Sequence, residues 1–228
     1  MTVRVEDREP GLRVILLDRP DKRNALDLPT VAALGDAIRS AGGATIVLGS
    51  TAPDAFSAGA DLHLADADRA AVSEALYALY FEMRSAPQVI IAAASGHAVG
   101  GGAQLLIASD LRVAAPDLRI RFVGPGHGLA VGAWGLPSLV GRGRATDLCL
   151  SMRSVAADEA LTIGLIDRLA DDPLGAAIDY ARDLCRLDPG ALRAVKMIVG
   201  MADAVEALRS EQTYNSGWDG SIPAPRDD

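Results

Sequence analysis

The chain alternates short apolar runs with helical patterns, and this alternation restricts its fold more than any other feature. Between the runs, apolar residues recur at helical spacing, as in residues 28–38 and 68–84. Strands that alternate with helices are typical of an α/β domain. The runs that predict strands are residues 12–17, 45–48, 89–93 and 111–114, of which 45–48 and 89–93 are expected to be buried.

The second part of the sequence has a different pattern. From Pro137 onward it is almost wholly helical, with breaks at glycine and proline. No linker divides the 228 residues, which are enough to bury a core without metal or disulfide. We therefore expect one domain over residues 1–228. It has an α/β core at 1–136 and a helical C-terminal extension at 137–228, whose last residues, 221–228, form a frayed tail.

Composition restricts the classes of partner. A net charge of −8 argues against nucleic acid, because binding phosphates needs a basic face. The longest apolar run, residues 89–94, is far shorter than the ~20 residues that cross a bilayer, and the N-terminus has no apolar leader segment. With 3 His and 2 widely separated Cys, we expect no metal site and no disulfide. The sequence thus predicts a cytoplasmic protein without a membrane span.

A glycine-rich segment joins a predicted buried strand to a predicted helix. Residues 95–104 read Ser-Gly-His-Ala-Val-Gly-Gly-Gly-Ala-Gln. Such a turn leaves backbone N–H groups free at the positive end of the helix dipole, where they bind an anion or a developing oxyanion. The spacing fits neither the dinucleotide fingerprint nor the P-loop. Close packing of the helix on the strand explains the glycines equally well, so both interpretations remain open.

Further segments occur with it, in order, along nearly the whole chain. They read Arg-Pro-Asp-Lys-Arg-Asn-Ala-Leu at 19–26, Phe-Ser-Ala-Gly-Ala-Asp-Leu at 56–62, Gly-His-Ala-Val-Gly-Gly-Gly at 96–102, Ser-Asp-Leu-Arg-Val-Ala at 109–114, and Ala-Asp-Glu-Ala-Leu at 157–161 followed by Gly-Leu-Ile-Asp at 164–167. Together they resemble the crotonase superfamily, the enoyl-CoA hydratase/isomerase group. The resemblance implies a right-handed spiral of ββα units and a helical region that forms a homotrimer, often a hexamer.

The resemblance also implies the ligand, a fatty acyl-CoA or enoyl-CoA thioester, with no other cofactor. In the family two backbone N–H groups hold the thioester oxygen and stabilise an enolate. By motif position these belong to Ala60 and Gly101. Lys22 and Arg23 would supply the local positive charge that an acidic chain needs for CoA. The implied CoA-binding positions are Lys22, Arg23, Ala25, Leu26, Ala58, Asp61 and Leu62.

The chain departs from the resemblance at the catalytic carboxylates. Family hydratases carry one glutamate two residues after the glycine triplet, where this chain has Gln104. The second glutamate position is occupied by Gly124. A glutamine cannot take a proton from water, and a glycine has no side chain. If the missing carboxylates alone prevent hydration, Gln104→Glu combined with Gly124→Glu should raise it.

Other residues offer a replacement. His127 lies in the loop that forms the acyl pocket in the family, and it is either a substitute base or a loop residue without a catalytic role. Trp134 is either a wall of the acyl pocket or a core residue. The sequence therefore predicts an acyl-CoA-binding protein, a carrier or sensor, with weak or absent hydratase activity. The alternative is an isomerase, decarboxylase or thioesterase that uses another residue such as His127.

Overall fold

The computed structural model describes residues 2–200, which contain two β-sheets. Neighbouring strands run parallel, except for the antiparallel pairs β1–β2 and β8–β9. The large sheet has the order β1 (Val3–Glu9), β2 (Leu12–Leu17), β3 (Thr45–Ser50), β5 (Ile90–Ala94), β7 (Leu111–Ala114) and β10 (Arg168–Leu169). The small sheet has the order β4 (Ala55–Ser57), β6 (His97–Val99), β8 (Arg119–Arg121) and β9 (Val155–Ala156).

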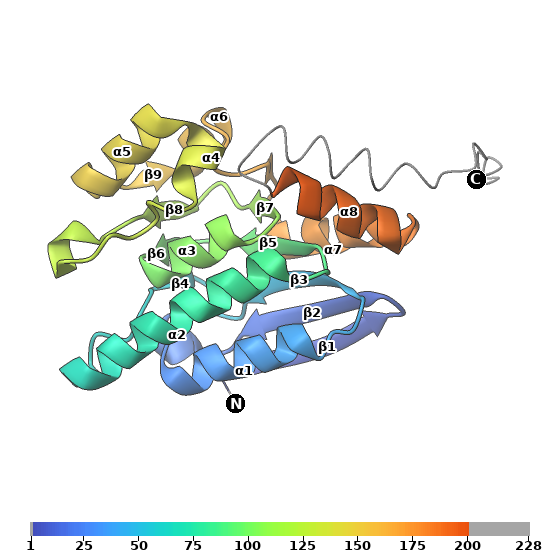
Figure 1. Cartoon of the computed structure of the whole chain (residues 1–228), viewed down its shortest axis with the longest axis horizontal. Coiled ribbons are helices and arrows are strands. Elements are labelled where there is room, and N and C mark those ends of the chain that lie inside the picture. The colour runs from blue at the N-terminus through green and yellow to red at the C-terminus, as the bar shows by residue number, and fades with distance from the viewer. Residues whose placement is uncertain (1, 201–228) are drawn as a thin grey trace.

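The chain builds these sheets as a repeated unit. β3 and β4 precede α2 (Asp66–Ser85), and β5 and β6 precede α3 (Gly101–Ala108). Each unit adds one strand to the large sheet and one to the small sheet before its helix (Figure 1). The predicted ββα arrangement is therefore present, and it brings the ends of β4 and β6 beside the start of α3.

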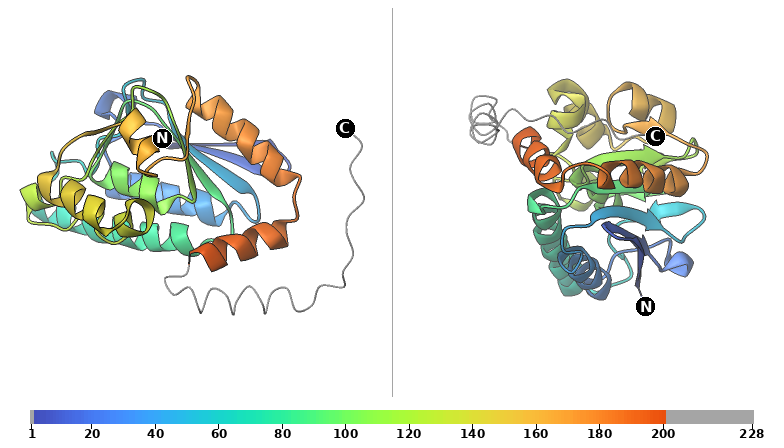
Figure 2. Two further views of the ribbon diagram at one scale, coloured as in Figure 1. Left: turned by 90° about the horizontal axis from the view of Figure 1, so that it is seen from above. Right: turned by 90° about the vertical axis from the view of Figure 1, so that its right-hand side faces the viewer.

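The large sheet is covered on both faces. In β2, Val14 and Leu16 contact the cluster under α7 (Pro173–Cys185), whereas Ile15 and Leu17 belong to the main core. Helices α1 (Leu28–Arg39) and α2 lie on the side opposite α7 (Figure 2). This burial on both faces explains why the strands read as continuous apolar runs.

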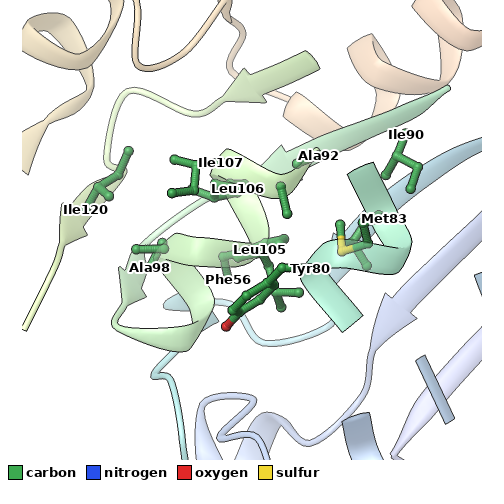
Figure 3. Packing of buried hydrophobic residues seen from close by; sticks show 14 of the residues in the cluster. Phe56, Tyr80, Met83, Ile90, Ala92, Ala98, Leu105, Leu106, Ile107 and Ile120 are labelled. Carbon is green, nitrogen blue, oxygen red and sulfur yellow. The ribbon is translucent and has the colours of Figure 1, made fainter. Parts of the chain in front are cut away.

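Local sequence features determine where α1 begins and which face of α2 is buried. Asp27 caps α1, because its carboxylate accepts a hydrogen bond of 2.9 Å from the Thr30 N–H. Apolar residues of α2, among them Tyr80 and Met83, pack beside Leu105 of α3 and Phe56 of β4 (Figure 3). The helices predicted over 28–38 and 68–84 are confirmed.

The remainder is mainly helical up to residue 200. It contains α4 (Leu136–Val140), α5 (Arg142–Ser151), α6 (Ala157–Thr162), α7 and α8 (Pro189–Val199), interrupted by the short strands β9 and β10. Residues 201–228 of the predicted extension, with the predicted frayed tail, lie outside the described residues. Within residues 2–200, no helix combines the length and apolar character that crossing a membrane requires.

Candidate functional site

A cavity of about 1090 Å³ opens beside the glycine-rich turn. One face of α2 forms one wall, and residues from β8 to the loop after η2 (Pro125–His127) form the other. The ends of β4 and β6 and the start of α3 complete it. Its lining residues are Ala58, Gly59, Ala60, Leu62, Arg69, Ala70, Ser73, Glu74, Leu76, Tyr77, Val99, Gly100, Gly101, Gln104, Arg121, Val123, Gly126, His127, Leu129, Val131 and Met152.

Gly101 presents a free backbone N–H to this cavity. It is the first residue of α3, so its N–H has no partner within the helix. The preceding Gly100, at φ 54°, instead donates its N–H to the Arg121 carbonyl at 2.9 Å. Within residues 2–200, no group accepts a hydrogen bond from the Gly101 N–H. The positive end of the α3 dipole therefore faces the cavity with an available donor.

Ala60 presents a second free N–H, because of how its segment pairs with Leu26. Leu26 donates its N–H to the Gly59 carbonyl at 2.8 Å and accepts from the Asp61 N–H at 2.9 Å. Successive groups of an extended chain point to opposite sides, so the Ala60 N–H points away from Leu26. It has no acceptor in the described part of the chain.

The two donors lie side by side because Gly59 has no side chain. Gly59 has φ 87°, and a Cβ there would lie 2.6 Å from the Val99 carbonyl oxygen and 3.3 Å from the Gly101 nitrogen. Any larger residue would push the two segments apart. Two adjacent, unsatisfied N–H groups can hold one oxygen that gains negative charge.

Gln104 lies in the same cavity and is 4% exposed. Its Oε1 accepts hydrogen bonds from the Gly132 N–H at 3.1 Å and the Trp134 Nε1 at 2.9 Å. These donors fix the amide, and a neutral amide takes up no proton. Trp134 stacks on Tyr80 with ring centroids 6.0 Å apart, and it is 41% exposed rather than part of the cavity lining or the core.

Tyr80 of α2 anchors the first residue of α3 by a hydrogen bond. Burial raises the pKa of the Tyr80 hydroxyl well above its ordinary value, so the hydroxyl keeps its proton. It donates that proton to the Gly101 carbonyl at 3.0 Å. The start of α3 is thereby held to α2 while the Gly101 N–H remains free.

Gly124, the second predicted position, is buried and outside the cavity lining. A Cβ there would lie 2.4 Å from the Leu129 oxygen and 2.6 Å from the Val131 nitrogen. The loop after η2 folds back onto this glycine and leaves no room for a side chain. The structure thus adds a steric condition to the expectation that two glutamates would restore hydration.

Of the ionisable residues that line the cavity, which also include Arg69, Tyr77 and Arg121, His127 and Glu74 lie on opposite walls. His127, predicted from the sequence, comes from η2, and Glu74 comes from α2. Sequence reasoning missed Glu74. Val72 and Leu76 are buried apolar residues of α2, four positions apart. Glu74 lies two positions from each of them, a spacing that indicates the opposite, exposed face of the helix. That face becomes a cavity wall only because the loop after η2 approaches it, with the Tyr77 hydroxyl donating to the Ala130 carbonyl at 2.7 Å.

A second cavity of about 360 Å³ adjoins the first. Ala58, Ala60 and Leu62 line both. All the predicted CoA-binding positions except Leu26 line the second cavity, and Leu26 pairs with Ala60 beside it. Those lining positions are Lys22, Arg23, Ala25, Ala58, Asp61 and Leu62.

Asn24 holds the basic segment in place. It is 1% exposed, has φ 52°, and donates its side-chain amide to Ser50 Oγ at 2.7 Å and the Phe56 carbonyl at 3.1 Å. Its side-chain oxygen accepts from the Arg19 N–H at 2.8 Å. Asparagine tolerates this left-handed conformation better than most residues. The segment from Arg19 to Ala25 is therefore fixed against β4. Among residues 2–200, no three His, Cys, Asp or Glu side chains gather as metal ligands.

Comparison with known protein sequences gives a consistent set of matches. The profile of the enoyl-CoA hydratase/isomerase family matches residues 7–218. A probable enoyl-CoA hydratase of Mycobacterium tuberculosis (strain CDC 1551 / Oshkosh) is 38% identical over 211 residues, which cover 90% of this chain and 86% of the relative. Cyclohexa-1,5-dienecarbonyl-CoA hydratase of Thauera aromatica is 34% identical over 229 residues, which cover 92% and 87%.

Solved structures agree with the sequence matches. The enoyl-CoA hydratase from Bacillus anthracis superposes with a TM-score of 0.89 at 25% identity, covering 95% of this chain and 90% of that one. The enoyl-CoA hydratase from Thermoplasma volcanium GSS1 gives a TM-score of 0.84 at 29% identity, covering 95% and 91%. The fold class predicted from the sequence is therefore confirmed.

Proposed function

The chain belongs to the enoyl-CoA hydratase/isomerase family, and we propose that it binds fatty acyl-CoA thioesters with weak or absent ordinary hydratase activity. The observation that carries the proposal is the adjacency of the free N–H groups of Ala60 and Gly101 at the cavity. A thioester oxygen placed between them is stabilised by two hydrogen bonds and by the positive end of the α3 dipole. An enolate oxygen, which carries more negative charge, is stabilised more strongly.

The adjoining cavities divide the ligand into two parts. The acyl group lies in the larger cavity, between α2 and the loop after η2. The CoA moiety lies in the smaller cavity, where Lys22 and Arg23 bring positive charge to an otherwise acidic protein. Ala58, Ala60 and Leu62 line both cavities, which supports a thioester position where the two cavities meet.

Hydration lacks its proton-transfer groups at the family positions. Adding water to an enoyl double bond needs a base for the water and an acid for the α-carbon. Here Gln104 is a neutral amide with two fixed donors, and Gly124 is packed against backbone. Each lost partner typically costs about 10²–10⁴ in rate. Oxyanion stabilisation alone retains a rate acceleration of about 10²–10³-fold.

One observation favours the second candidate, an active enzyme of another reaction class. His127 lines the acyl cavity, where its imidazole can act as a general base. An isomerase, decarboxylase or thioesterase would then depend on it. Loss of such an activity in His127→Ala, with acyl-CoA affinity retained, would establish this candidate.

We also propose a homotrimer or hexamer in the cytoplasm, as expected from the family resemblance. Exposed apolar side chains on α8 support association: Val195 is 59%, Met197 54% and Val199 78% exposed. Light scattering at micromolar concentration should give a trimer or hexamer mass, and a lone monomer would refute this part.

Infrared spectroscopy tests the proposed binding mode. A thioester carrying ¹³C at its carbonyl is titrated with the protein, while calorimetry follows binding for several chain lengths. Hydrogen bonds from both N–H groups should lower the carbonyl stretching frequency below its value in buffer. Binding without that change would refute the assigned oxygen site, and no binding at millimolar ligand would refute acyl-CoA as the ligand.

A further inference from the structure

Among residues 2–200, Glu74 is the one carboxylate residue that lines the acyl cavity. It comes from α2, a helix that carries neither of the family's glutamate positions. The other polar side chains of the lining are those of Arg69, Ser73, Tyr77, Gln104, Arg121 and His127, and the free donors of Ala60 and Gly101 face the same cavity. The chain therefore has a carboxylate in the cavity although Gln104 and Gly124 supply none.

Glu74 lies on the cavity wall that α2 forms, and it remains exposed to solvent. Arg69, Ser73, Glu74 and Tyr77 line the cavity along one face of the helix. The Tyr77 hydroxyl donates to Ala130, so the loop after η2 approaches α2 one turn beyond Glu74. The two views agree that the first half of α2 and this loop lie on the same side of the molecule (Figures 1 and 2).

Glu74 has no structural partner within the described residues. Glu82, on the same helix, instead forms an ion pair of 2.6 Å with Arg39. A carboxylate without a cation or hydrogen-bond donor remains free to accept a proton. An acyl chain filling the cavity would bring substrate carbon atoms beside this wall.

We propose that Glu74 is the proton-transfer residue of an enoyl-CoA isomerase reaction in this cavity. The inference rests on the proposed function, because the thioester oxygen must lie at Ala60 and Gly101. Isomerisation suits this site because it needs one group that removes and returns a proton. It needs no activated water, so the loss of both hydratase glutamates does not prevent it.

The step is balanced within the protein and its substrate. For a β,γ-unsaturated acyl-CoA, the Glu74 carboxylate takes a proton from the α-carbon. The C–H electron pair moves toward the thioester oxygen, and the dienolate is held by the two N–H groups. The protonated Glu74, which is exposed, exchanges its proton with solvent and then protonates the γ-carbon as the electrons return to form the α,β double bond. No oxidant, reductant or water is consumed.

Proton exchange in D₂O tests this role directly. The full chain is incubated with 3-hexenoyl-CoA, deuterium incorporation is followed by mass spectrometry, and the conjugated product is followed by absorbance. The wild type should incorporate deuterium and form the α,β isomer. Glu74→Gln, similar in size and unable to act as a base, should lower both rates by at least about 10²-fold.

Asp68→Asn is the matched control, because Asp68 is an exposed acidic residue of α2 that does not line the cavity. It should keep the wild-type rates. Calorimetry on all variants separates binding from chemistry. Absence of exchange in a wild type that binds the ligand overturns the role of Glu74 and leaves the proposed function standing. Full exchange in Glu74→Gln also overturns it, and absence of binding overturns both.

Discussion

The indole nitrogen of Trp134 donates a hydrogen bond of 2.9 Å to the side-chain oxygen of Gln104. The Gly132 N–H donates to the same oxygen at 3.1 Å. The residue at a family glutamate position is thus a fixed acceptor rather than a mobile side chain. This geometry gives a first expectation for attempts to restore hydration.

The double variant Gln104→Glu with Gly124→Glu should gain little or no crotonyl-CoA hydration. A glutamate at 104 keeps both donors, but a Cβ at 124 would lie 2.4 Å from the Leu129 oxygen. The forced shift of this loop should cost about 1–3 kcal/mol of stability. Loss of enoyl absorbance and thermal melting provide the measurements, with Gln104→Glu alone as the control. Strong hydration by a stable double variant would show that the loop after η2 accommodates a side chain at position 124, and would contradict this prediction.

Gly59→Ala should weaken acyl-CoA binding and destabilise the protein, whereas Gly42→Ala should leave binding unchanged. Both glycines have positive φ, 87° and 67° respectively, so the backbone strain is matched. Only at Gly59 would the new Cβ collide with another segment, at 2.6 Å from the Val99 oxygen. Calorimetry should show at least about a tenfold loss of affinity, which corresponds to 1.4 kcal/mol. Equal affinities in the two variants would contradict the packing argument.

Lys22→Ala should lower the affinity for acyl-CoA and leave that for acyl-pantetheine unchanged. Lys22 lines the smaller cavity, and acyl-pantetheine lacks the nucleotide phosphates that this charge would meet. The loss should shrink as salt is added, since exposed charges are screened. Arg186→Ala, at the exposed end of α7, is the control. An equal loss for both ligands would place the nucleotide elsewhere.

Asp110→Asn should destabilise the chain by about 3–5 kcal/mol, because it leaves the Lys196 ammonium buried without its counter-charge. The two groups are 2.9 Å apart, and the Lys196 side chain is 5% exposed. Urea unfolding of Asp110→Asn, Lys196→Met and the double variant should show that the double variant regains much of the loss. Additive losses would mean that the pair is not coupled.

The same lysine predicts a pH dependence of stability. Burial lowers the pKa of Lys196 from 10.5, an effect that Asp110 partly opposes. Just below pH 10.5 the unfolded chain therefore binds more protons than the folded chain, so this group makes the free energy of unfolding rise with pH. The difference in unfolding free energy between wild type and Lys196→Met should show this rise. A difference independent of pH would mean that Lys196 titrates normally.

Periodicity in the sequence predicted the elements whose burial is regular. β2 was predicted at its observed bounds, and the helix predicted over 28–38 corresponds to α1. β1 gave no signal, because five of its seven residues are exposed and its pattern is polar. β6 and β8 span three residues each, too few for a period to be read. Such strands form because the spiral brings their partners beside them.

The motifs placed Ala60 and Gly101, but their adjacency depends on contacts between distant segments. Gly59 packs on Val99, and Leu26 turns the Ala60 N–H toward the cavity. Glu74 lies on a helix face that local pattern marks as solvent-exposed. Only the loop around Ala130, more than fifty residues later, makes it part of a wall. A helical period contains no information about such a contact.

The most direct test of the account follows the wild-type protein with crotonyl-CoA by two signals at once. Heat release reports binding, and enoyl absorbance reports hydration. We predict a saturable binding isotherm while the absorbance stays constant, because Ala60 and Gly101 provide donors and neither Gln104 nor Gly124 transfers a proton. Rapid loss of absorbance, at the rate of a family hydratase assayed beside it, would contradict the account.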